Sequence, residues 1–76
     1  MQINEETMTA IAKFKQRGDI TAISEAAQVS TIYVSRTFRL KEGSPKVVNA
    51  IVDHYNKVIP QRKKQRAAAE KLASHD

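Results

Sequence analysis

The stretch from residue 30 to residue 39 carries the side chains best suited to recognising another molecule. Ile32 and Arg36 are four residues apart, so on a helix they share one face, and Arg39 extends that face. An arginine can hydrogen-bond O6 and N7 of guanine, and an isoleucine can pack on the methyl group of thymine. A purely solvated helix face gives no reason for the isoleucine. The pattern therefore favours a recognition helix, about residues 31–39, that reads base edges in the major groove.

Polar and cationic side chains around this face predict contacts with the DNA backbone. Ser30 is a good N-cap, and the helix that it opens can also hold a phosphate through its free N–H groups. Tyr33 either donates its hydroxyl to a phosphate or half-buries against the first helix. The predicted phosphate contacts are Ser30, Tyr33, Ser35, Arg39, Lys46, Arg62, Lys63, Lys64 and Arg66.

Catalytic and metal chemistry find little support in the chain. It contains no cysteine, which excludes a disulfide framework, a thiolate zinc site and a cysteine nucleophile. Asp53 and His54 are adjacent, so on a helix they point about 100° apart and cannot form a dyad. His54 and His75 have no partner at metal-ligand spacing. We expect no enzyme activity, no metal site and no cofactor.

Four helices are predicted to position these residues. The first covers residues 4–17, and the second runs from Asp19 to a tight turn at residues 28–29. The third covers residues 31–40, and the fourth begins at Pro45 and ends at Ile59 because a proline follows. Asn4, Ser30 and Ser44 are the expected N-caps, and Gly18 is expected to end the first helix.

Apolar residues at helical spacing predict a single core. Val34 and Phe38 are expected to bury the third helix, and Ile59 either completes the core or forms the seam of a homodimer. The other predicted core side chains are Met8, Ile11, Phe14, Ile20, Ile23, Ala27, Val47, Val48, Ile51, Val52, Tyr55 and Val58.

Composition limits the fold and the class of partner. The 76 residues suit one small domain, and two glycines and two prolines are too few for a sheet-rich fold. The net charge of +5 favours a polyanionic partner. No apolar run approaches the roughly 18 residues that span a bilayer, and the N-terminus lacks a secretory pattern. We expect an all-α, four-helix, cytoplasmic domain with no membrane partner.

The run E-A-A-Q-V-S-T-I-Y-V-S-R, residues 25–36, resembles the DNA-binding headpiece of the lac repressor family, which shows A-G-V-S-x-x-T-V-S-R there. The likeness continues in S-P-K at residues 44–46, in A-I-V-D-H-Y at residues 50–55 and in V-I-P-Q-R at residues 58–62. It covers roughly residues 19–73. The resemblance implies a helix-turn-helix fold, with Thr31, Ile32 and Arg36 as the base-contacting residues.

A change of composition after Pro60 divides the chain into a helix-turn-helix domain, residues 1–60, and a basic tail, residues 61–76. The tail matches a hinge that becomes helical on DNA, and Leu72 is the candidate for its minor-groove wedge. A disordered basic tail is the alternative. The family's ligand-binding domain has no counterpart, so no small-molecule effector is expected.

The sequence therefore predicts a small phage- or plasmid-type regulator, a repressor that binds double-stranded DNA by sequence, in the nucleoid or in a phage-infected cell. The alternatives are an architectural or virion-associated DNA-binding protein without strong sequence preference, and a protein–protein adaptor.

Overall fold

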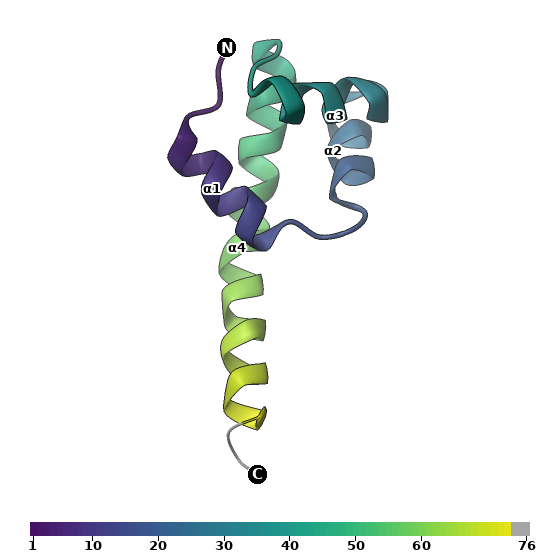
Figure 1. Cartoon of the computed structure of the whole chain (residues 1–76). Coiled ribbons are helices and arrows are strands. Elements are labelled where there is room, and N and C mark those ends of the chain that lie inside the picture. Colours follow the sequence, from purple (N-terminus) through teal and green to yellow (C-terminus); the bar gives the residue numbers. More distant parts are fainter. Residues whose placement is uncertain (74–76) are drawn as a thin grey trace.

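Four helices build the chain, and the fourth is by far the longest. The computed structural model describes residues 1–73, with α1 at Glu5–Phe14, α2 at Asp19–Ala27, α3 at Thr31–Leu40 and α4 at Pro45–Ala73. Figure 1 shows α1, α2 and α3 gathered around the first half of α4, with α3 lying across its axis, while the second half extends beyond them. The predicted all-α, four-helix fold is confirmed.

The predicted helix starts follow local capping chemistry. Asn4 Oδ1 accepts the Thr7 N–H at 2.7 Å, and Ser30 Oγ accepts the Tyr33 N–H at 3.1 Å. Ser44 accepts the Val47 N–H through its Oγ at 3.4 Å. These bonds satisfy backbone donors that a helix start leaves without an internal partner.

The end of α1 differs from the prediction. The helix stops at Phe14 instead of residue 17, and Lys15 is extended. Gly18, at φ 95°, serves as the N-cap of α2 and not as the C-terminal stop of α1. The linker forms because Gln16 and Asp19 bond each other: the Gln16 N–H donates to Asp19 Oδ2 at 2.9 Å, and the Asp19 N–H donates to the Gln16 carbonyl.

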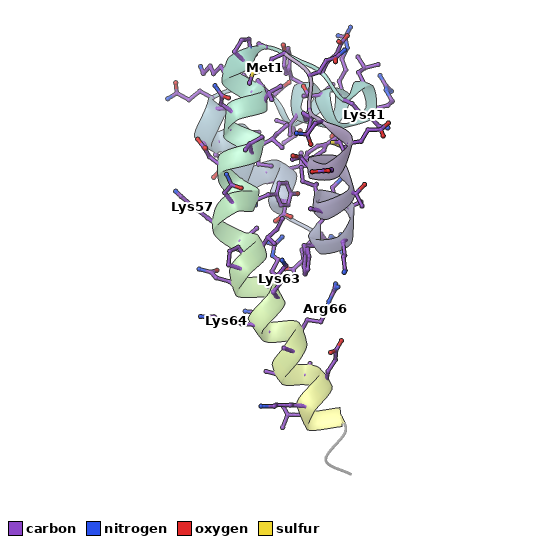
Figure 2. All side chains as sticks on the ribbon, turned by 90° about the vertical axis from the view of Figure 1, so that its left-hand side faces the viewer. Met1, Lys41, Lys57, Lys63, Lys64 and Arg66 are labelled. Carbon is purple, nitrogen blue, oxygen red and sulfur yellow. The ribbon has the colours of Figure 1, made fainter. Side chains whose placement is uncertain are left out.

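The core lies between α4 and the other three helices. Its fully buried side chains include Ile11, Ile23, Val34, Ile51 and Tyr55. Ile59 is half-buried against this core. Figure 2 shows α1 lying alongside the first half of α4, with side chains of both helices between them.

Phe38 departs from the expected pattern, because Thr37 takes the fully buried position and Phe38 is only half-buried. The loop before α4 explains the choice of a small side chain. A Cβ atom on Gly43 would lie 2.8 Å from Thr37 Oγ1, so the loop packs directly on the threonine. The Thr37 hydroxyl donates to the Tyr33 carbonyl at 3.0 Å, which satisfies it inside the core.

The fourth helix does not end at Ile59 as predicted. It continues through Pro60 to Ala73. Proline cannot donate to the carbonyl four residues earlier, but Pro60 is exposed, so water can hydrate that carbonyl. Two arginines beyond the proline hold the second half of α4 against α1, as described below. No break separates residues 1–60 from the described part of the tail.

None of the helices in residues 1–73 combines the length and apolar character needed to cross a membrane.

Candidate nucleic-acid interface

The turn between α2 and α3 fixes the angle at which α3 leaves the core. Ser24 and Ala27 are buried where the two helices meet, and small side chains there let them approach closely. Gln28 adopts the left-handed conformation at φ 57°, a geometry that costs a non-glycine residue roughly 1 kcal/mol. The Val29 N–H then donates to the Ser24 carbonyl at 3.0 Å. α2 and α3 are thus two short helices joined by a tight turn at residues 28–30.

The face of α3 opposite the core is exposed as predicted. The Ile32 side chain is 78% exposed, although it is one of the larger apolar residues of the chain. Arg36 and Arg39 are exposed beside it. Thr31 and Ser35 complete the exposed face. The structure thus brings together on one helix all three predicted base-contacting residues.

Tyr33 lies to one side of this face, 39% exposed. It borders a recess of about 480 Å³ with Met1, Arg36 and Leu40, so it does not half-bury against α1. The N-terminus lines the same recess, and the Met1 ammonium donates to the Gly43 carbonyl at 3.0 Å. Lys46, in the first turn of α4, is exposed as expected.

No family model, characterised protein or solved structure matches the chain.

A buried carboxylate at the start of α2 organises the other end of the domain. Arg62 binds it with two hydrogen bonds, from Nη1 to Asp19 Oδ2 and from Nη2 to Asp19 Oδ1, each 2.8 Å. The Tyr55 hydroxyl donates to Oδ2 at 2.9 Å, and His54 Nε2 lies 3.2 Å from Oδ1. The side chain of Asp19 is only 4% exposed and that of Arg62 15%.

Burial alone would raise the pKa of the Asp19 carboxyl. The hydrogen bonds from Arg62, the Gln16 N–H, His54 and Tyr55 outweigh it and hold the pKa well below the usual 3.8. Burial and the neighbouring Asp19 raise the pKa of Tyr55. The Asp19 hydrogen bond likewise raises the pKa of Arg62. Asp19 is therefore ionised and Arg62 charged at neutral pH, and their pairing is structural.

The depressed pKa of Asp19 predicts acid-sensitive stability. Below the unfolded-state pKa, near 3.8, the unfolded chain binds a proton that folded Asp19 does not, so stability falls with falling pH until the folded-state pKa is passed. The expected contribution to the slope is about 1.4 kcal/mol per pH unit. Urea unfolding between pH 5 and pH 2 measures it, and Asp19→Asn should remove that part of the slope. An unchanged slope in Asp19→Asn would contradict the assignment.

Arg62 requires a correction to the predicted phosphate contacts. Its guanidinium faces inward, donating to the Phe14 carbonyl at 3.0 Å as well as to Asp19, so it is not directed at an external phosphate. Lys63, Lys64 and Arg66 are exposed on the second half of α4. Leu72 is 73% exposed near the end of that helix. His75 lies outside the described residues.

The contacts of Asp19 with Arg62, Tyr55 and His54 were not predicted from the sequence, in which Asp19 is only the expected start of a helix. Asp19 and Arg62 are 43 residues apart, and no periodic pattern links them. The one signal in the sequence was the position of Asp19 beside Ile20, which belongs to the predicted core face. An acidic residue at the core is unusual unless its carboxylate has a partner.

Proposed function

We propose that the chain is a transcriptional regulator that binds double-stranded DNA by sequence, with α3 in the major groove. The observation that carries this proposal is the exposed Ile32 beside Arg36 on the outer face of the helix-turn-helix. An apolar side chain that is 78% exposed gains little in water, and a thymine methyl group offers it an apolar partner.

Each proposed contact follows from the position of its residue. Thr31, Ile32 and Arg36 contact base edges, while Ser30, Tyr33, Ser35, Arg39 and Lys46 contact phosphates around the groove. The resemblance to the lac repressor headpiece supports the same assignment. A chain of this kind acts in the cytoplasm and represses by occupying its operator.

Operators are commonly palindromic, which makes a homodimer the natural binding unit. On α4, Ile59 and Leu72 are apolar side chains accessible to a second copy: the first is half-buried at the edge of the core, and the second is exposed beyond it.

Selection of bound sequences from a random DNA pool identifies the operator, and an arginine substitution then tests the readout. Arg36→Ala should weaken binding to the selected site by about 1–3 kcal/mol, with a much smaller loss on a scrambled duplex. Fluorescence anisotropy at fixed salt measures both affinities. Lys57→Ala is the control, because it removes one exposed cation from α4 and leaves α3 intact.

Equal losses on both duplexes would reduce Arg36 to a phosphate contact. If selection yields no preferred sequence, the architectural alternative replaces the proposal. If no duplex binds at low salt, the protein–protein adaptor replaces it.

A further inference from the structure

Cations from α1, from the residue that follows it and from α4 gather where α1 ends against α4, apart from the outer face of α3. We name this group the junction cluster; its members are Lys13, Lys15, Lys63 and Arg66. Arg66 Nη2 donates to the Lys13 carbonyl at 3.0 Å, which fixes the two helices together at this point. The cluster is therefore part of the folded domain and not a feature of a separate tail.

The ring of Phe14 is the centre of the cluster. The guanidinium of Arg66 lies 4.7 Å from the ring centroid, and the ammonium groups of Lys13 and Lys63 lie at 5.8 Å and 5.9 Å. A negative ring face attracts each cation, but the cations repel one another. No carboxylate of residues 1–73 lies within 4.0 Å of the four charged groups. Such a concentration of like charge is stabilised by an anionic ligand.

The surface between these cations is hollow and polar. A recess of about 310 Å³ is bordered by Lys13, Lys15 and Arg66, with the amides Gln16 and Gln65 also on its rim. All of these groups can donate hydrogen bonds to oxygen, which suits a phosphate group.

Lys15 connects the junction cluster to the recognition helix. Its ammonium group lies 4.6 Å from the ring centroid of Phe38, in the last turns of α3. Basic surface therefore continues from the C-terminal end of α3, through Lys15, to the second half of α4. This continuity favours one ligand that contacts both places.

The direction of α4 relates the cluster to a duplex held by α3. A recognition helix lies in the major groove, so its axis crosses the axis of the duplex. The axis of α4 crosses that of α3 (Figure 1), so residues farther along α4 lie farther along the duplex. Arg66 lies 11 residues beyond Tyr55, which packs against Phe38 of α3. At about 1.5 Å per residue, this is roughly 16 Å along α4, or about half a turn of B-DNA.

We propose that the junction cluster binds the sugar–phosphate backbone of the duplex that α3 reads, about half a turn outside the bases that α3 contacts. The inference rests on the proposed function, which supplies the duplex. The Asp19–Arg62 pair positions the cluster before DNA arrives, so no folding of the tail is required for this contact.

The test combines cluster variants with shortened DNA. Lys13→Gln/Lys63→Gln removes two cluster charges. Lys57→Gln/Lys71→Gln removes two exposed charges of α4 that belong neither to the cluster nor to the predicted phosphate contacts, and is the matched control; Figure 2 shows Lys57 on the side of α4 away from α1. Affinities are measured by anisotropy across a salt series on the selected site, with full flanks or with one turn removed from either flank. Thermal melts by circular dichroism establish that both variants are folded.

We expect the cluster variant to bind the full duplex about tenfold more weakly and to lower the slope of log K against log salt by about 2. Removing one flank should weaken the unmodified protein and the control more than the cluster variant, which keeps only Lys15 and Arg66 of the cluster. Equal losses for the cluster variant and the control would overturn the proposal, because the α4 charges would then act without a defined site. A cluster variant that loses as much affinity on flank removal as the unmodified protein would overturn it too.

These results separate the two proposals. A protein that discriminates the selected site from a scrambled duplex but shows no flank effect refutes only the extended footprint. A protein with equal affinity for the selected and scrambled duplexes refutes the proposed function, and the extended footprint with it.

Discussion

Arg62→Ala is expected to lower the free energy of unfolding by about 3 kcal/mol, because it leaves the buried Asp19 carboxylate without its cation. Asp19 keeps its hydrogen bonds with Tyr55, His54 and the Gln16 N–H. The loss in free energy of unfolding is therefore expected at the low end of the range for breaking a buried ion pair. The Phe14 carbonyl also loses its donor. The effect is measured by urea unfolding at pH 7.

The same substitution should loosen α4 beyond Pro60. Arg62 and Arg66 are the two side chains of that half that hydrogen-bond α1, within the described residues. Hydrogen exchange should therefore show faster amide exchange over residues 61–73 in Arg62→Ala. Lys64→Ala is the control, since it removes an exposed cation from the same helix and should change stability by less than about 0.5 kcal/mol. Similar stability of the two variants would show that the ion pair does not hold the helix.

Tyr55→Ala should be the most damaging single substitution considered for this domain, at about 4 kcal/mol. The ring is 2% exposed and makes edge contacts with Phe38 at 6.3 Å and with His54 at 5.0 Å between ring centroids. Its loss empties the space between α3 and α4 and removes a hydrogen bond to Asp19. For a domain of this size we expect the melting temperature to fall by roughly 20 °C.

One further variant separates the contribution of the Tyr55 ring from that of its hydroxyl, and a second serves as the control. Tyr55→Phe keeps the ring and loses only the hydroxyl, so it should cost about 2 kcal/mol, the value of a hydrogen bond to a charged group. Tyr33→Ala is the matched control, because the second tyrosine of the chain is 39% exposed on α3. If the Tyr55→Ala and Tyr33→Ala variants have the same melting temperature, Tyr55 lies outside the core.

The sequence by itself determined the features that depend on neighbouring residues. Asn4 and Ser30 cap helices because their side chains reach backbone donors three residues ahead, an interaction that needs no other element. The bounds of α3 and its exposed face at Ile32 and Arg36 likewise follow from the 3.6-residue period. The exposed face of α3 could therefore be predicted from the sequence.

Only the tertiary structure decided the features that depend on distant residues. Local rules end a helix before Pro60, yet α4 continues because Arg62 reaches Asp19, 43 residues away, and Arg66 reaches Lys13, 53 residues away. Thr37 rather than Phe38 is fully buried because the loop at Gly43 packs on it. The junction cluster could not be predicted for the same reason. Its lysines and arginine come from α1, from the residue after it and from α4, and these segments lie side by side only in the folded chain.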